Sequence, residues 1–211
     1  MAKKKRRIKL KKIFLLLLII GLLIYIGVFI IKGKKKEPQK EVEVIDTIDD
    51  FGYELNENET KYYKDLFDKL KNLLKEENYD EQEYATLIAQ LFVIDFYDLD
   101  SKIMKSDIGG TQFVYEEYRE DFEKGAKAGM YKYIENNIYG DRKQELPTVK
   151  EVTQESIENN IFKYNNESDI NAYYLTMNIN YTKDLGYPTK VELVLIHNDD
   201  RLEVAKLETK A

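Results

Sequence analysis

The sequence predicts an α+β protein, with helices in the first half of one folded domain and antiparallel strands in the second half. Apolar residues recur at helical spacing between Thr60 and Asn137. After Pro147 they alternate with polar residues, as in strands that bury one face. The breaks "KDLGYP" and "NDD" contain residues typical of turns between neighbouring antiparallel strands. Consecutive helices followed by consecutive strands indicate helices packed on one face of a sheet.

The domain is preceded by an uncharged run of 19 residues, from Ile13 to Ile31. As a helix this run would be about 28 Å long, close to the ~30 Å hydrocarbon thickness of a bilayer. A cleavable signal has an apolar stretch of only about 7–15 residues before a small-residue cleavage site. Here lysines follow directly, at Lys32 and Lys34–Lys36. We therefore predict a retained, single-pass transmembrane helix over residues 13–31.

Basic residues flank this helix on both sides, and the larger group precedes it. Four basic residues follow the helix, and eight lie in the arm 1–12: Lys3, Lys4, Lys5, Arg6, Arg7, Lys9, Lys11 and Lys12. Because the more basic flank favours the cytoplasm, we expect a cytoplasmic N-terminus and an extracytoplasmic C-terminal domain in the cell membrane. The lipid bilayer is then a partner, and the arm contacts anionic headgroups.

The remainder of the chain is strongly acidic. Residues 1–36 hold 12 of the 33 basic residues and no acidic residue, so residues 37–211 carry 21 basic and 39 acidic residues, a net charge of −18. This charge disfavours nucleic acid as a partner of the folded part. The chain has no cysteine, which excludes disulfides and cysteine chemistry. The abundance of Asn, Lys, Ile and Tyr indicates a low-GC, Gram-positive-type bacterium.

Residues 32–59 are charged, contain Pro38 and Gly52, and lack helical periodicity, so we expect a linker with one extended piece at Val42–Ile45. A single extracytoplasmic domain is expected over residues 60–208. Asp80 and Glu83 have the spacing of a capping box at a helix start. The predicted helices are 60–78, 80–104 and 115–137, with Gly109-Gly110 as the break before the third, whose buried face would carry Tyr118, Phe122, Ala126 and Tyr133.

The strands are expected in five short segments after Pro147. The segments are "TVKEVTQ", "SIENNIFKY", "INAYYLTMNINYT", "TKVELVLIH" and "RLEVAKLE". The third places Tyr173, Leu175, Met177, Ile179 and Tyr181 on one face, which we expect to be buried.

This order of elements, with the strands "GYPTKVELVLI" and "DDRLEVAKLE", resembles the NTF2-like cone fold. A basic tail, one membrane span and an exported NTF2-like domain are similar to the plan of VirB8-type components of conjugative type IV secretion machines. The resemblance covers residues 60–208 in layout, plus the anchor, and rests on element order rather than on a motif. It implies three helices against a curved antiparallel sheet. NTF2-like domains serve as enzymes, ligand carriers and scaffolds, so the resemblance does not select a function.

The sequence contains no recognisable catalytic signature. The patterns G-x-S-x-G, H-E-x-x-H, G-x-G-x-x-G and the phosphate loop do not occur. The only histidine, His197, stands beside a turn, and the acidic pairs Asp49-Asp50 and Asp199-Asp200 lack the spacing of a calcium loop. We therefore expect no metal, no cofactor and no enzymatic activity.

One residue conflicts with its surroundings. Asp95 falls in the middle of the apolar face of the second predicted helix, and Asp98 lies at its margin. A carboxylate that faces a core must be paired or hydrogen-bonded. NTF2-like enzymes use a carboxylate inside the cone as a general base, and burial would raise the pKa of such a group. The alternative is a structural carboxylate bonded to a tyrosine hydroxyl or a backbone amide.

A ligand pocket would draw on few residues. Gly125 and Gly129 form a small-residue strip on the third helix, which indicates close packing or room for a ligand. The candidate pocket residues are Asp95, Asp98, Tyr84, Gly125 and Gly129.

Two functions are compatible with these features. The first is a membrane-anchored, extracytoplasmic interaction module that assembles with other envelope proteins or with itself, as a VirB8-like part of a conjugation or secretion apparatus. The second is a small-ligand-binding or acid/base domain that uses a cone pocket with Asp95. The first needs an exposed apolar or self-complementary patch, and the second needs a concave pocket with Asp95 at its wall.

The predicted topology is testable with single cysteines, because the chain has none of its own. In intact cells, an impermeant thiol reagent should label a Thr209→Cys variant and leave a Lys5→Cys variant unlabelled. Labelling of Lys5→Cys alone would invert the topology. A mature chain that lacks residues 1–31 would replace the anchor with a cleaved signal.

Overall fold

The structure is a computed structural model that describes Ile20 and residues 42–210 of the 211-residue chain. The basic arm and the predicted span 13–31 lie outside the described residues, apart from Ile20. Within the part that is described, no helix is both long enough and apolar enough to cross a membrane. Residues 42–211 form one unit with its own core.

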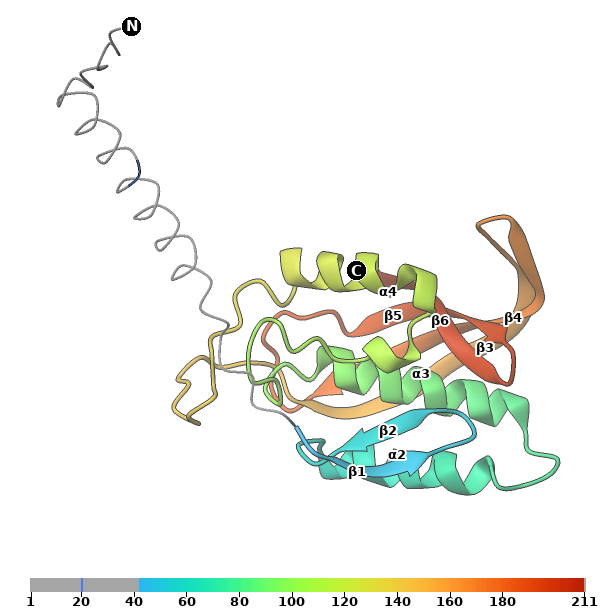
Figure 1. The fold of residues 1–211 in the computed structure, drawn as a ribbon, viewed down its shortest axis with the longest axis horizontal. Helices are drawn as coiled ribbons and strands as arrows, with labels where there is room; N and C mark the ends of the chain where they lie inside the picture. Colours follow the sequence, from blue (N-terminus) through green and yellow to red (C-terminus); the bar gives the residue numbers. More distant parts are fainter. Residues whose placement is uncertain (1–19, 21–41, 211) are drawn as a thin grey trace, which may run out of the picture. The chain divides into compact units, whose positions relative to one another are not determined.

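Over residues 42–210 the architecture is α+β, as predicted, with three α-helices and a curved, unclosed antiparallel sheet (Figure 1). In chain order the elements are β1 (Val44–Ile48), β2 (Tyr53–Asn56), α2 (Lys61–Leu73), α3 (Glu81–Tyr97), the 3₁₀ turn η1 (Thr111–Phe113), α4 (Glu116–Ala128), β3 (Val149–Tyr164), β4 (Glu167–Tyr181), β5 (Lys190–Asn198) and β6 (Arg201–Lys210).

The main sheet has the order β3–β4–β5–β6, so each strand pairs with its neighbour in sequence. Tyr173, Leu175, Met177 and Ile179 are buried on one face, as their alternation predicts, whereas Tyr181 is half-buried. The two segments expected at residues 148–164 are one continuous strand, β3. Three register shifts interrupt its pairing with β4, and such irregularities let a long strand bend without ending.

The hairpin β3–β4 extends past the rest of the sheet. The pairing of β4 with β5 stops at Tyr173 opposite Leu195, whereas β3 and β4 stay paired up to Tyr164 opposite Glu167 (Figure 1). Near the tip, Asn165 bonds to the side chains of Glu117 and Tyr118 at the start of α4. The tip is therefore fastened to α4, and we call residues 157–173 the hairpin arm.

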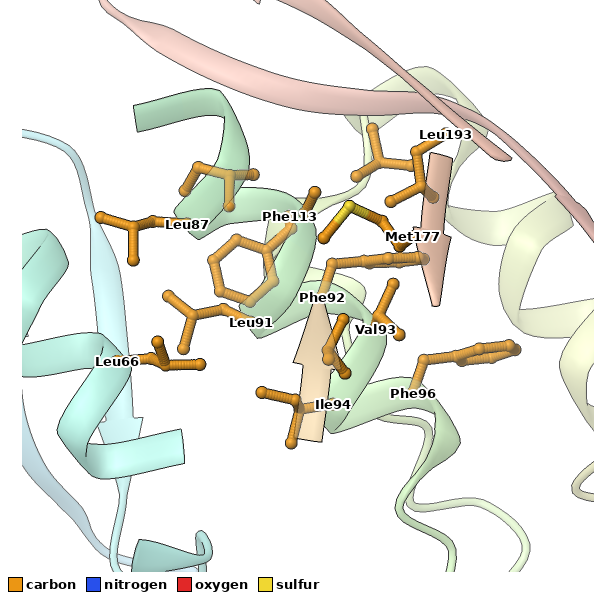
Figure 2. Packing of buried hydrophobic residues seen from close by; sticks show 14 of the residues in the cluster. Leu66, Leu87, Leu91, Phe92, Val93, Ile94, Phe96, Phe113, Met177 and Leu193 are labelled. Atoms are coloured by element: carbon orange, nitrogen blue, oxygen red, sulfur yellow. The ribbon is translucent and has the colours of Figure 1, made fainter. Parts of the chain in front are cut away.

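Helix α3 is the centre of the core. It contacts all four strands of the sheet as well as α2. Figure 2 shows Leu66, Leu87 and Leu91 on its α2 side, and Met177 and Leu193 on its sheet side. A helix enclosed in this way is apolar around most of its circumference rather than along one stripe. Its start agrees with the prediction, since the Asp80 side chain accepts hydrogen bonds from the amides of Gln82 and Glu83.

Residues 42–59, expected as the end of a linker, instead include the hairpin β1–β2. Tyr53 and Leu55 of this hairpin are buried in the main core. Charged residues dominate the segment, but every second residue of β2 is apolar and points inward. A four-residue strand is too short for its alternation to stand out among charged neighbours.

All three helices end earlier than their periodicity predicts, and α2 ends at Leu73 rather than near residue 78. Helix α3 ends at Tyr97 rather than near residue 104, because the chain turns at Asp98 and the Ser101 hydroxyl donates to the Asp98 carbonyl. Helix α4 ends at Ala128 rather than near residue 137, because Gly129 leaves the helical conformation. Tyr133, expected on the buried face of that helix, is exposed as a result.

The contribution of β1–β2 to the core can be measured by paired truncations. We expect Leu55→Ala to lower the free energy of unfolding by about 2–4 kcal/mol, the usual effect of emptying a buried leucine site. Val44→Ala on the exposed side of the same hairpin should change it by less than about 0.5 kcal/mol. Denaturant unfolding of the two variants provides the comparison. Equal, small effects would show that the hairpin is not part of the folded core.

Candidate functional site

A polar cavity of about 260 Å³ lies beside the end of α3. On one side it is lined by the hairpin β1–β2 and the turn that follows, including Glu59. On the other side are Asp95 and the loop 98–112, including Lys102 and Asp107. Asp95, the residue that conflicts with its surroundings in the sequence, is thus at the wall of a cavity rather than inside the sheet.

Asp95 is held through both of its carboxylate oxygens. Oδ1 forms an ion pair with Lys102 Nζ, and Oδ2 accepts a 2.6 Å hydrogen bond from the amide of Gly110. Only 9% of Asp95 and 3% of Lys102 are exposed, so the two form a buried ion pair in which each charge is the other's partner in place of water. Lys102 comes from the segment expected to continue the helix, and it reaches Asp95 because α3 ends at Tyr97.

The two glycines of "SDIGG" allow the backbone to approach Asp95. A Cβ atom on Gly109 would overlap the carbonyl and side-chain oxygens of Asp95. Gly110 has φ +77°, a left-handed conformation, and a Cβ atom there would lie 2.8 Å from Phe92. Gly109 and Gly110, which the sequence predicts to interrupt the helices, therefore also form the backbone that covers the Asp95 carboxylate.

Further contacts fasten the loop 98–112 to its neighbours. The Tyr131 hydroxyl donates to the Phe96 carbonyl at 2.7 Å and accepts from the Gly109 amide at 3.2 Å. Arg142 donates to the carbonyls of Asp100 and Lys102 at 2.7 and 2.8 Å. These contacts join the end of α3, the loop and the segment after α4 into one polar network.

The charges around the cavity do not balance. Burial disfavours the charge on Lys102, but the Asp95 carboxylate outweighs burial and raises the pKa of Lys102. Glu59 is half-buried, and burial together with the charges of Asp95 and Asp107 raises its pKa to about 8. The raised pKa values favour the neutral form of Glu59 and the charged form of Lys102.

Asp98, the second candidate carboxylate, belongs to the turn rather than to the cavity. It is 2% exposed, its Oδ1 accepts a long 3.4 Å bond from the Ser101 amide, and its Oδ2 has no partner among the described residues. Burial raises the pKa of Asp98 to about 6, and the charge of Lys102 partly opposes this shift. Asp98 is a buried acid close to its titration range at neutral pH.

The other candidate pocket residues are not brought to Asp95. Tyr84 bonds to the Tyr53 hydroxyl at 2.6 Å and accepts from the Leu202 amide, and burial raises the pKa of Tyr84 to about 12. Gly125 on α4 and Gly129 directly after it are exposed; a Cβ on Gly125 would meet nothing within 4 Å, and one on Gly129 would meet only the Gly125 carbonyl oxygen, at 3.1 Å. The glycine strip therefore neither packs closely nor lines the cavity.

Sequence reasoning missed Lys102 and Glu59. Their signals are visible only in retrospect: Lys102 is seven residues after Asp95 and directly before the apolar pair "IM", whereas Glu59 is one acid among many. Sequence reasoning also missed the partners of His197. Its Nδ1 lies 2.7 Å from Asp169 Oδ2, and its Nε2 lies 3.3 Å from Glu81 Oε1. This histidine connects β4, β5 and the start of α3.

Among the described residues, no group of three or more His, Cys, Asp and Glu side chains has an arrangement that could hold a metal ion. Comparison of the chain with protein-family models, with curated proteins and with solved structures finds no match. Function must therefore be argued from the site itself. A carboxylate whose two oxygens are already bound to an ammonium and an amide is poorly placed to remove a proton from a substrate.

A structural role for Asp95 predicts the effect of neutralising it. Asp95→Asn leaves the Lys102 ammonium buried without its counter-charge, so we expect the free energy of unfolding to fall by about 3–5 kcal/mol. In Asp95→Asn/Lys102→Met, where neither charge remains, much of this loss should be recovered. Thermal or denaturant unfolding at neutral pH measures both. A more stable Asp95→Asn protein would identify Asp95 as a strained, poised base instead.

Proposed function

We propose that the chain is a single-pass, membrane-anchored interaction module whose acidic C-terminal domain assembles with other proteins outside the cytoplasm. The observation that carries this proposal is the state of Asp95. Both of its oxygens are bound within the protein, so the carboxylate suspected of catalysis serves the fold. The proposed anchor rests on the apolar run 13–31, and its orientation rests on the larger number of basic residues before this run than after it.

The hairpin arm supplies a surface suited to such a role. Ile161 and Ile170 are 55% and 66% exposed, although isoleucine is among the residues most often buried. Both lie beyond the last pair between β4 and β5, where the two-stranded hairpin continues without a third strand. These two isoleucines are the positions of the hairpin arm through which, in this proposal, the domain contacts a partner.

The finer form of the proposal is an NTF2-like domain in a VirB8-like component of a conjugation or secretion apparatus. Three helices and a curved, unclosed antiparallel sheet support it at the level of architecture. The plan of basic arm, apolar run and acidic domain in the sequence supports it too. Under this form the partners are other envelope proteins or further copies of the chain.

A second candidate function is the binding of a small ligand in the polar cavity. It is favoured by one observation, the position of Asp95 and Glu59 at the wall of a space of about 260 Å³. A space of this size suits only a small polar molecule. Without a free catalytic base it supports binding rather than turnover.

Photo-crosslinking in the native cell envelope tests the interaction module. A photoreactive amino acid at position 161 or 170 of the full chain should give discrete adducts with a partner or a second copy. The same group at Glu76, an exposed polar position outside the arm, should give none. Ile161→Ser/Ile170→Ser should lose the assembly with little change in stability, because both side chains are exposed. Absence of adducts from a correctly inserted chain would contradict the proposal.

A further inference from the structure

His197 lies where the hairpin arm leaves the main sheet. The pairing of β4 with β5 stops at Tyr173 opposite Leu195, although β5 continues to Asn198. Beyond that point the side chain of Asp169, in the arm, takes the place of a strand partner. Its Oδ2 accepts a 2.8 Å hydrogen bond from the His197 amide and lies 2.7 Å from the ring Nδ1. The base of the arm is therefore fastened to the end of β5 through this histidine.

The other ring nitrogen of His197 faces the start of α3. Nε2 lies 3.3 Å from Oε1 of Glu81, the first residue of that helix. The second oxygen of the same carboxylate, Oε2, accepts a 2.9 Å hydrogen bond from the Tyr173 hydroxyl. The imidazole thus lies between two carboxylates, one from the arm and one from α3.

The number of protons on the imidazole decides how many of these contacts it can make. A neutral imidazole donates from one nitrogen and accepts at the other, whereas a carboxylate only accepts. Neutral His197 can therefore bond to one carboxylate, and the shorter distance assigns its proton to Nδ1, which faces Asp169. The bare Nε2 then faces an oxygen of Glu81, lone pair against lone pair. The charged imidazole donates from both nitrogens and forms charge-assisted bonds with both carboxylates.

Asp169 is suited to be the fixed partner of this histidine. Its side chain is only 8% exposed, and its Oδ1 accepts a 2.8 Å hydrogen bond from the Asn171 amide. Burial alone would raise the pKa of Asp169, but the amides of His197 and Asn171 and the imidazole outweigh burial and lower this pKa. Asp169 is therefore an anion throughout the range in which a histidine side chain changes its charge.

The remaining titratable groups near the imidazole are acids and a phenol. Asp80 caps α3, and its carboxylate accepts from backbone amides of that helix. Asp199 and Asp200 are exposed in the turn after β5. Burial and the bond to Glu81 raise the pKa of Tyr173 to about 12, so its hydroxyl stays neutral and keeps donating to Glu81. These surroundings favour a positive charge on the imidazole.

We propose that His197, Asp169 and Glu81 form a proton-dependent clasp, which joins the base of the hairpin arm to the start of α3 while the imidazole is charged. Loss of the proton leaves the bond to Asp169 and breaks the bond to Glu81. The clasp is therefore strongest at low pH, and it weakens as the pH rises through the interval of about 5 to 8 in which histidine changes its charge. His197 is the only histidine in the chain, so this change belongs to one residue.

The clasp makes the proposed contact surface dependent on pH, a consequence that rests on the interaction module proposed above. The arm carries Ile161 and Ile170, and at its tip Asn165 is bonded to side chains at the start of α4. With the clasp closed, the arm is held at its tip and at its base. A surface held in this way loses less conformational freedom on binding, so the yield of crosslinks from the arm should be higher at pH 6 than at pH 8.

Hydrogen exchange of the full chain in mild detergent at pH 5.5, 6.5, 7.5 and 8.5 tests the clasp, with rates corrected for the intrinsic effect of pH. The amides of His197 and Asn171 are the reporters, because both donate to Asp169. Their protection should fall about three- to tenfold across this range. The change is modest because the side chains of His197 and Glu81 are 31% and 50% exposed. In His197→Gln, which carries no charge at any of these pH values, the fall should be absent.

Glu81→Gln provides a matched variant with the opposite expected sign. Its amide group can donate to the bare Nε2 of the neutral imidazole, while its oxygen still accepts from Tyr173. The protection of the two reporter amides should then be higher at pH 8.5 than at pH 5.5. In the wild type at pH 8.5, nitrogen NMR of the single histidine should place the proton on Nδ1.

Three results would each overturn the clasp. They are reporter amides whose protection does not change with pH in the wild type, a fall of the same sign in Glu81→Gln, and a proton on Nε2 at pH 8.5. All three are measured on the chain without a partner. The clasp and the interaction module can therefore fail separately.

Discussion

The buried ion pair between Asp95 and Lys102 is the constraint on which the surrounding structure depends. A charge inside a core is tolerated only with a partner and with hydrogen bonds to its remaining sites. Lys102 can reach Asp95 only if α3 stops at Tyr97 and the chain folds back over the end of the helix. Gly109 and Gly110 must then approach the carboxylate closely, which no larger residue allows. One carboxylate thus determines a helix end, a loop path and a glycine pair.

The same pair explains the electrostatics of the cavity. Lys102 is committed to Asp95, and burial together with the charges of Asp95 and Asp107 raises the pKa of Glu59 to about 8. The hairpin β1–β2 is attached through Tyr53 and Leu55 in the core and through the Gln112 side chain, which bonds to the backbone amide and carbonyl of Glu54.

The sequence predicted those parts of the fold that rest on local patterns. The strands β4 to β6 and the start of α3 follow from alternation and a capping residue, and the structure contains them. The early ends of α3 and α4 could not be predicted, since apolar spacing continues past both. The chain leaves the helical conformation at Asp98 after α3 and at Gly129 after α4. Asp95 was identified by its conflict with an apolar face. Its partners were not, because Lys102 and Glu59 become its neighbours only through the folded loop and hairpin.

Exchange of the Gly110 amide, which donates to Asp95 Oδ2 at 2.6 Å, tests the central claim most directly. If the ion pair fixes the loop to α3, this amide opens only when the domain unfolds, and its free energy of exchange equals that of the Phe92 amide in the middle of α3. Native-state exchange followed by NMR at low denaturant concentrations gives both values. Exchange at Gly110 that is orders of magnitude faster than at Phe92 would contradict the account, because the loop would then move independently of Asp95.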